Sequence, residues 1–389
     1  MIENIRLYTV FNSKLKPSIK VKVFTEHGEY SASVPSGTSK GSHEVCEISI
    51  KNALRVFPKI RKELIGMEEN HEKIDRILTR LDGTKNFRKI GGNLALAISI
   101  AVARAQFKGK LWRLFGLRRT FPLPISNIIG GGKHGGGTSW QEFLVIPYMV
   151  KDPEDALRTL IEIWLTVGEE LKSRKMLLGR NLENAWMSSM DDLKTLDFLS
   201  NIAEDWHVKL GIDFAASALW KNGRYRYRKG KKGISPENQL DLIIETAKKY
   251  KLYYLEDPLH ENDFEGFAIL RKSLKDRLIV GDDLYCTNLR RFEKGILNKS
   301  TNGIIVKPNQ SGTLWHANRI IELSEKHSII TIASHRSGET EDNWISDLAV
   351  AWKSPFIKIS VLGYDISKHN RLIELWEDIP EPKMADLPL

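Results

Sequence analysis

Six short apolar segments decide the fold of this chain: VKLGID (208–213), YYLE (253–256), RLIVGD (277–282), GIIVK (303–307), SIITIASH (328–335) and FIK (356–358). Each segment resembles a short buried β-strand and ends in a polar residue. The final residues follow one another at intervals of 43, 26, 25, 28 and 23 residues. Since a strand and its crossover helix take roughly 25–30 residues, this rhythm predicts an α/β protein with a (β/α)8-type barrel.

The polar residue that ends each segment predicts the position of the active site. In (β/α)8 barrels the site is built at the C-terminal ends of the strands, and several strands contribute to it. Here the strand ends supply three carboxylates, two lysines and one histidine: Asp213, Glu256, Asp282, Lys307, Lys358 and His335. Because none of these ends is apolar, we favour a catalytic rim over a set of unrelated polar caps.

The three carboxylates predict a site for a hard divalent cation. Carboxylate oxygens without a neighbouring His or Cys cluster favour Mg²⁺ or Mn²⁺ over Zn²⁺. The alternative is that they only form ion pairs with lysines of the barrel. A lysine among other cations loses its proton more readily, which makes it a candidate general base. A metal and a neutral lysine together suit proton abstraction beside the carboxylate of a small anionic substrate.

The first 120 residues have a different pattern of apolar and polar residues. Residues 19–25 (IKVKVFT) and 29–34 (EYSASV) alternate apolar and polar side chains, which predicts two β-strands. Residues 42–115 contain Ala-, Leu- and Ile-rich stretches long enough for buried helices. We therefore expect a smaller α+β N-terminal capping domain over residues 1–120 and a catalytic barrel over residues 121–389.

The composition excludes several classes of protein. The chain has 389 residues, of which 41% are hydrophobic, and no run of about 18 apolar residues predicts a transmembrane helix. Its first residues lack the apolar core of a secretory signal. Its two cysteines, Cys46 and Cys286, are too few for a disulfide framework and fit a reducing compartment. We therefore expect a cytoplasmic protein with no membrane partner.

The net charge of +10 raises the question of an anionic partner. We favour a Lys/Arg/Glu-rich surface of the kind found in thermophiles, then steering of a small anionic substrate, and last nucleic acid. The segment KNGRYRYRKGKKG (221–233) contains seven basic residues and two tyrosines. We interpret it as a solvated hairpin that turns at Asn222-Gly223, with stacking on RNA bases as the alternative.

Several blocks of the chain resemble the enolase family of phosphopyruvate hydratases. The resemblance is carried by VPSGTSKGSHE (34–44), GGNLALAISIAVARA (91–105), ISNIIGGGKHGGGTSWQEFLVIP (125–147), LEDPLHENDFEGF (255–267), KPNQSGTL (307–314) and SHRSGETEDNWISDLAV (334–350). The blocks occur in order over nearly the whole chain. They imply a Mg²⁺-dependent lyase of glycolysis that interconverts 2-phosphoglycerate and phosphoenolpyruvate. They also imply a homodimer or higher homo-oligomer and two Mg²⁺ ions in each active site.

The resemblance implies roles for residues at the metal and the substrate. The first Mg²⁺ is expected at Asp213, Glu256 and Asp282, and the second is expected with help from Ser39. Lys307 is expected to remove the C2 proton of 2-phosphoglycerate. Four further residues are expected near the substrate, the first two at its phosphate: Arg336, Ser337, His134 and His335.

The resemblance also implies an acid and its support. Glu183 is expected to help the C3 hydroxide leave, and Glu142 is expected to support Glu183. Lys358 is expected to hold the substrate carboxylate and to lower the pKa of Lys307. This pKa shift would prepare Lys307 to accept a proton.

Two segments depart from the family pattern. In the acid loop NLENAWMS (181–188) only Glu183 remains of the motif's core, and Asn184-Ala185 replaces two glycines. The alternative for Glu183 is a place on a solvated loop. The C-terminal block 358–371 is shortened and lacks two arginines. Two rival functions follow: an enzyme of the same superfamily that acts on another carboxylate, or a non-catalytic protein that binds RNA or another partner.

Overall fold

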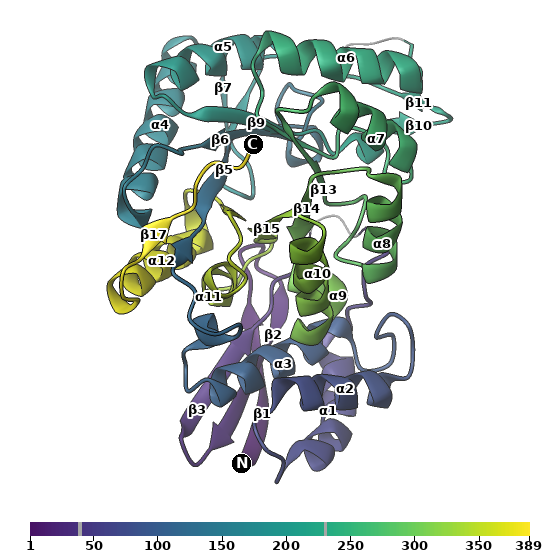
Figure 1. The fold of residues 1–389 in the computed structure, drawn as a ribbon, viewed down its shortest axis with the longest axis vertical. Coiled ribbons are helices and arrows are strands. Elements are labelled where there is room, and N and C mark those ends of the chain that lie inside the picture. The colour runs from purple at the N-terminus through teal and green to yellow at the C-terminus, as the bar shows by residue number, and fades with distance from the viewer. Residues whose placement is uncertain (38–40, 229–231) are drawn as a thin grey trace.

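The computed structural model describes residues 1–37, 41–228 and 232–389. The N-terminal elements gather at one end of the molecule and the barrel lies at the other (Figure 1). The chain opens with an antiparallel sheet of three strands: β1 (Ile2–Phe11), β2 (Pro17–Thr25) and β3 (Gly28–Ser33). The predicted alternation is confirmed in β2, where Ile19, Val21 and Val23 are fully buried.

Three helices complete the N-terminal part: α1 (Ile50–Leu64), α2 (His71–Asp82) and α3 (Gly92–Gln106). The α3 sequence is apolar on nearly all sides, and such a helix is stable only when it is buried. It packs against β2 and β3 on one side and against α2 and the short helix α9 (Pro308–Ser311) on another. This contact joins the N-terminal part to the barrel.

Eight strands form the closed barrel: β5 (Leu123–Gly130), β6 (Glu142–Ile146), β9 (Lys209–Asp213), β12 (Tyr254–Glu256), β13 (Leu278–Gly281), β14 (Gly303–Val306), β15 (Ile330–Ser334) and β16 (Phe356–Lys358). They pair in this order, and β16 pairs with β5 to close the barrel. All six segments quoted above supply a barrel strand. The predicted fold is therefore confirmed.

One strand departs from a uniform (β/α)8 pattern. β6 runs antiparallel to both of its neighbours, β5 and β9. Only residues 131–141 separate β5 from β6, too few for the crossover helix that a parallel pair requires. Because β6 is reversed, its first residue, Glu142, lies beside Asp213 at the rim where the other strands end.

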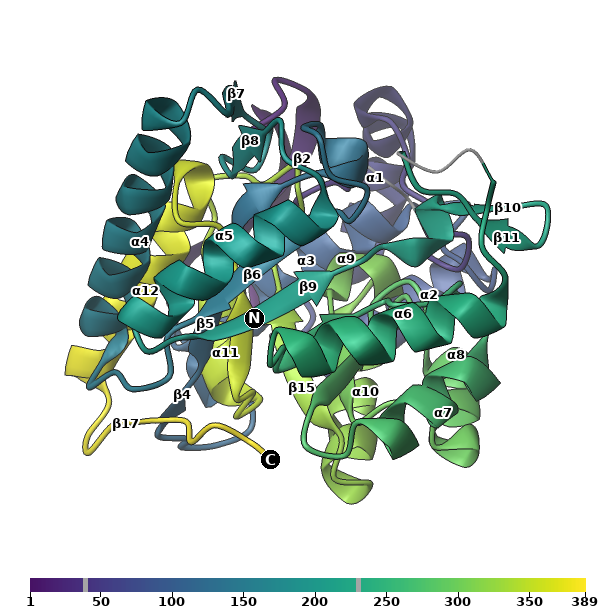
Figure 2. The same ribbon diagram turned by 90° about the horizontal axis from the view of Figure 1, so that it is seen from above.

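Helices surround the barrel (Figure 2): α4 (Pro153–Ser173), α5 (Asp192–Asp205), α6 (Pro236–Lys249), α7 (Phe264–Ser273), α8 (Leu289–Asn298), α10 (Leu314–Lys326), α11 (Trp344–Ala351) and α12 (Ile366–Asp378). Capping side chains fix several of their starts, as when Asp152 accepts a hydrogen bond from the Asp155 N–H. Short strands pair at the periphery: β4 (Thr120–Phe121) with β17 (Lys383–Met384), β7 (Leu177–Arg180) with β8 (Trp186–Ser188), and β10 (Trp220–Lys221) with β11 (Arg224–Tyr225). Within the described ranges, no helix has the length and apolar character needed to span a bilayer.

Strand geometry places the polar rim above an apolar layer. Side chains two positions apart on a strand point to the same face, so the residue two before each polar end shares its direction. Tyr254, Val280, Ile305 and Phe356 hold four of these six positions, and all four belong to one buried apolar cluster. This layer fills the barrel and leaves only the rim for charged side chains.

Candidate active site

A cavity of about 320 Å³ lies at the C-terminal end of the barrel. Ten of the predicted site residues line it: His134, Glu142, Glu183, Asp213, Asp282, Lys307, His335, Arg336, Ser337 and Lys358. Glu256 is fully buried and reaches this cavity through its contact with Lys358. Ser39, expected at the second Mg²⁺, lies outside the described residues.

Lys358, at the end of β16, is the meeting point of three carboxylates. Its Nζ atom lies 2.7 Å from Glu256 Oε2, 2.9 Å from Glu142 Oε2 and 3.0 Å from Asp213 Oδ2. The three acids converge because they are register partners on β6, β9 and β12. Burial alone would lower the pKa of Lys358, but these carboxylates raise it well above its ordinary value. Lys358 is therefore a fixed positive charge.

Lys307 follows β14, and its Nζ atom forms an ion pair with Asp282. Burial lowers the pKa of Lys307, but Asp282 raises it and outweighs the lowering effects of Arg336 and Lys358. Lys358 thus acts in the expected direction, yet the net shift is upward and Lys307 is an ammonium. A general base must lose this proton, and any group that neutralises Asp282 would lower the pKa of Lys307.

The carboxylates of the site fit a divalent cation. Among the described residues, Glu256 Oε1 is buried without a hydrogen-bond partner, and burial together with Asp213 raises the pKa of Glu256 well above its ordinary value. Carboxylate oxygens of Asp257, Asp282 and Asp283 lie within 4.8 Å of one another. Buried negative charge on oxygen donors alone suits Mg²⁺. A cation held there would also compete with Lys307 for Asp282.

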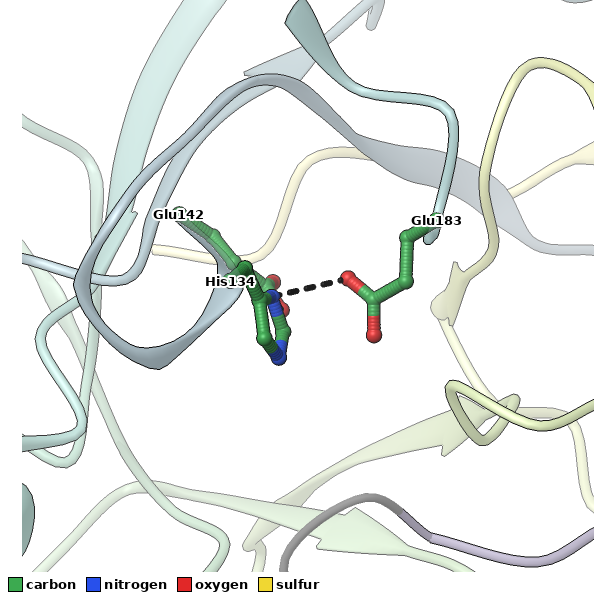
Figure 3. A group of neighbouring side chains, drawn as sticks. All are labelled: His134, Glu142 and Glu183. Carbon is green, nitrogen blue, oxygen red and sulfur yellow. Dashed lines mark ion pairs between the residues drawn. The ribbon is translucent and has the colours of Figure 1, made fainter. Parts of the chain in front are cut away.

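His134, Glu142 and Glu183 form a second group (Figure 3), which Glu142 links to Lys358. His134 Nδ1 lies 3.2 Å from Glu183 Oε2 and 3.8 Å from Glu142 Oε1. Burial lowers the pKa of His134, but Glu183 and Glu142 raise it to about 9. Burial raises the pKa of Glu183, but His134 lowers it to about 2. A histidinium this close to a carboxylate can pass its proton to it.

Glu142 holds its proton more tightly than Glu183 does. Burial, Glu183 and Asp213 raise the pKa of Glu142, and the opposing effect of Lys358 is smaller. Before substrate binds, His134 therefore carries a proton and Glu183 does not, and Glu142 takes up a proton more readily than Glu183 does. Protonation of a leaving hydroxide at Glu183 would draw on these neighbours.

Hydrogen bonds shape the altered acid loop, and its Glu183 side chain is buried. Asn181 Oδ1 accepts hydrogen bonds from the Glu183 and Ala185 N–H groups, at 2.9 Å and 3.0 Å. Asn184 has φ +62°, a left-handed conformation that asparagine adopts more readily than most residues. Asn181 and Asn184 thus hold a turn where the family pattern has glycines. Only 8% of Glu183 is exposed, whereas a solvated loop would expose it.

Arg336 and His335 are held by buried charges, some of which come from the C-terminal block. The Arg336 guanidinium lies 3.1 Å from Glu44 Oε2, and its backbone N–H donates to Glu339 Oε1. His335 Nδ1 lies 2.5 Å from Asp365 Oδ2. Buried Lys368, which belongs to α12, bridges the two acids, 3.1 Å from Glu339 and 3.2 Å from Asp365.

Several residues of the site were not singled out from the sequence. Lys14, in the turn between β1 and β2, donates a 2.8 Å hydrogen bond to Ser337 Oγ. Glu44 pairs with Arg336, although the sequence marked only its block as a whole. No pattern distinguishes Lys14 from other loop lysines. Glu44 ends a block that carries the family resemblance, and that position was the available signal.

The basic segment does not present its tyrosines to a partner. Its turn at Asn222-Gly223 is confirmed, with left-handed φ values of +53° and +75° between β10 and β11. Tyr225 is fully buried, and the Tyr227 hydroxyl donates to Gln239. These tyrosines are not free to stack on RNA bases. Residues 229–231 of this segment lie outside the described residues.

Arg228, from the same segment, contacts the loop that carries His134. Its guanidinium donates to the carbonyl of Gly136 and, at 2.7 Å, to that of Gly132. Gly136 has φ +87°, a left-handed conformation that favours glycine. Arg228 thus bridges two carbonyls on either side of His134 while remaining exposed, as are Lys221, Arg224 and Arg226 of the same hairpin.

The fold and the site define a class of protein: a (β/α)8-type barrel whose rim joins carboxylates that fit a metal ion with two lysines. Comparison with protein families agrees with this class. The N-terminal domain of enolase matches residues 2–116, and the C-terminal TIM barrel domain of enolase matches residues 118–384. The chain belongs to the enolase family, the carbon–oxygen lyases that act as phosphopyruvate hydratases in glycolysis.

Individual relatives match over their full length. A protein named enolase from Archaeoglobus fulgidus is 37% identical over 399 residues, which cover 99% of each chain. Enolase from Picrophilus torridus is 37% identical, with 97% of this chain and 99% of the relative covered. Enolase from Sulfurisphaera tokodaii is 38% identical, with 97% of this chain and 96% of the relative covered. The likeness therefore extends over both domains.

Proposed function

We propose that this chain interconverts 2-phosphoglycerate and phosphoenolpyruvate through a base on one wall of the cavity and an acid on the other. One observation carries the proposal. Lys307 and Lys358 line the same small cavity as the His134–Glu183 pair. A substrate held between them would meet groups able to take a proton at one carbon and to supply one at the next.

On one wall, Lys307 accepts the proton from C2 of the substrate. It must first become a neutral amine, and its pKa falls when the charge of Asp282 is withdrawn. Asp213, Glu256 and Asp282 are the residues that would hold the first Mg²⁺. When bound, Mg²⁺ supplies positive charge that stabilises negative charge developing on the substrate carboxylate. Lys358 adds a second, permanent positive charge beside it.

On the other wall, Glu183 delivers a proton to the hydroxide that leaves C3. Its neighbour His134 holds a proton in the free enzyme and lies 3.2 Å from Glu183, so it can return a proton to Glu183. Arg336 and Ser337 bind the phosphate, and His335 lies beside them. A second Mg²⁺, with Ser39 among its ligands, completes the proposed substrate site.

The family resemblance extends the proposal beyond the active site. We place the boundary between the capping domain and the barrel near residue 120, and we expect a homodimer or larger homo-oligomer. We also expect the enzyme to act in the cytoplasm, where Cys46 and Cys286 stay reduced, consistent with both being free thiols here. Size-exclusion chromatography with light scattering tests the assembly.

The test of the proposed function is the ultraviolet absorbance of phosphoenolpyruvate formed from 2-phosphoglycerate. We expect turnover that disappears with a chelator and returns with Mg²⁺. Lys307→Ala should abolish turnover, whereas Lys272→Ala, a change of the same type at an exposed lysine outside the cavity, should leave it unchanged. Turnover on another carboxylate with none on 2-phosphoglycerate would contradict the proposal, and so would full turnover in chelator.

A further inference from the structure

A second cavity, of about 430 Å³, lies where the N-terminal part of the chain meets the barrel. Thr84 and Lys85 border it from the segment after α2, and Arg290 borders it from the first turn of α8. Trp315 and Arg319 border it from α10. Its volume lies in the range typical of sites for small ligands. The catalytic mechanism proposed above does not use it.

The charge around this second cavity has one sign. Lys85, Arg290 and Arg319 border it, and no carboxylate does so among the described residues. Arg319 pairs with Glu322 at 2.7 Å, whereas Lys85 and Arg290 have no ion-pair partner within the described part of the chain. Guanidinium and ammonium groups bind phosphate through strong charge-assisted hydrogen bonds. Uncompensated cations around a recess therefore favour a phosphorylated ligand.

The other residues that border the second cavity are uncharged, and three of them are aromatic: Phe87, Trp315 and His316. Trp315 is half-buried there, and the rings of Phe87 and His316 pack edge to face with centroids 5.7 Å apart. Burial lowers the pKa of His316 to about 4, so this ring is neutral at physiological pH. The rings do not form one flat wall, because the planes of Phe87 and His316 meet at 85° and those of Trp315 and His316 at 76°. Trp315 lies one helical turn from Arg319 on α10, so an aromatic ring and a cation border the cavity side by side. This pairing suits a ligand with a planar ring at one end and phosphates at the other.

A single layer of side chains separates this cavity from the catalytic one. Gln310 borders both cavities, and its Nε2 atom lies 3.3 Å from Asp282 Oδ1. Its Oε1 atom accepts a hydrogen bond from the Thr287 hydroxyl, which in turn accepts from the Lys307 N–H. A ligand in the second cavity would thus lie directly behind the backbone of the proposed base.

We propose that the second cavity binds a nucleoside diphosphate, with its phosphates at Lys85, Arg290 and Arg319 and its base against Trp315. The site spans both parts of the chain, so ligand binding would hold them together. It is separate from the proposed catalytic site, and it does not depend on which carboxylate the enzyme acts on.

Isothermal titration calorimetry with ADP tests this proposal on the full-length wild-type protein. The titration is run without substrate, and again in an equilibrium mixture of 2-phosphoglycerate and phosphoenolpyruvate that saturates the catalytic cavity. The pair Lys85→Ser/Arg290→Ser should raise the dissociation constant for ADP roughly tenfold or more, because each side chain makes a charge-assisted contact. The control pair Arg55→Ser/Lys62→Ser removes the same charge from the exposed face of α1 and should have no effect.

Two further measurements separate the halves of the proposed ligand. Trp315→Leu should weaken ADP binding but not the binding of inorganic pyrophosphate. Unchanged ADP affinity in the equilibrium mixture supports a separate site, whereas competition with substrate would overturn it. No saturable ADP binding below about 1 mM would also overturn the proposal. So would equal loss of affinity in the cavity pair and the control pair.

Discussion

Replacing Lys368 with methionine should destabilise the protein and weaken substrate binding together. Lys368 is 1% exposed and pairs with both Glu339 and Asp365. The Lys368→Met change keeps most of the volume but leaves two buried carboxylates with less positive charge. Removing one partner of a buried ion pair costs about 3–5 kcal/mol, which is a large part of a total stability of about 5–15 kcal/mol. Because Lys368 serves two acids, we expect the upper end of that range.

Thermal unfolding measures the first part of this prediction. At roughly 2 °C per kcal/mol, the melting temperature of Lys368→Met should lie about 10 °C below that of the wild type. The control Lys326→Met, on the exposed side of α10, should leave the melting temperature unchanged. Glu339→Gln should cost less in the Lys368→Met background than in the wild type, because the two residues interact. The KM for 2-phosphoglycerate should rise, because Glu339 and Asp365 hold Arg336 and His335. A melting temperature within about 1 °C of the wild type, or additive effects of the two changes, would refute this reasoning.

Two further predictions concern the loop of His134 and a buried carboxyl. Arg228→Ser should lower kcat/KM roughly tenfold, because it removes two hydrogen bonds that position this loop. The control Arg226→Ser, on the same hairpin, should leave kcat/KM unchanged. Equal effects of the two changes would contradict the role of Arg228 in positioning the loop. Burial raises the pKa of Asp75 from 3.8 to about 7. Between these two pH values the folded state keeps a proton that the unfolded state releases. The free energy of unfolding therefore falls by about 4 kcal/mol as pH rises from 4 to 7. Asp75→Asn should remove this component and stabilise the protein at pH 8, as measured by urea unfolding across pH; a smaller stability at pH 8 would contradict it.

The barrel and its rim could be predicted because both follow from short-range patterns. A strand has a side-chain period of two, so a polar residue that ends a buried apolar run must lie at the rim. The intervals between Asp213, Glu256 and Asp282 then placed these residues on successive strands. The reversal of β6 could also have been inferred, because the segment before Glu142 is too short for a crossover helix.

Contacts between segments that lie far apart in the chain could not be predicted from the sequence. Lys14 reaches Ser337 from a turn of the N-terminal sheet, and its sequence context resembles that of any loop lysine. The position of Arg228 depends on how a hairpin folds back over the His134 loop. Lys368 did carry a signal, because it shares a helical stripe with Leu372 and Leu375, at spacings of four and seven residues. A lysine on such a stripe predicts a buried charge with a partner.

The protonation states of the site required the structure. The sequence supported a lowered pKa for Lys307, because Lys358 was expected beside it. The structure adds Asp282, whose ion pair with Lys307 outweighs that effect. A pKa depends on all the charges within a few ångströms, and these come from several strands and loops at once.

Exchange of the C2 proton of 2-phosphoglycerate, followed by proton NMR in D₂O with Mg²⁺, tests the central claim most directly. The wild type should exchange this proton and form phosphoenolpyruvate, and Lys307→Ala should do neither. Glu183→Gln keeps its size but loses the acid, so product formation should fall by roughly 10²–10⁴ while exchange at C2 largely survives. The account predicts loss of the C2 signal without phosphoenolpyruvate in Glu183→Gln. Unchanged product formation in this variant, or equal collapse of exchange and product formation, would contradict it.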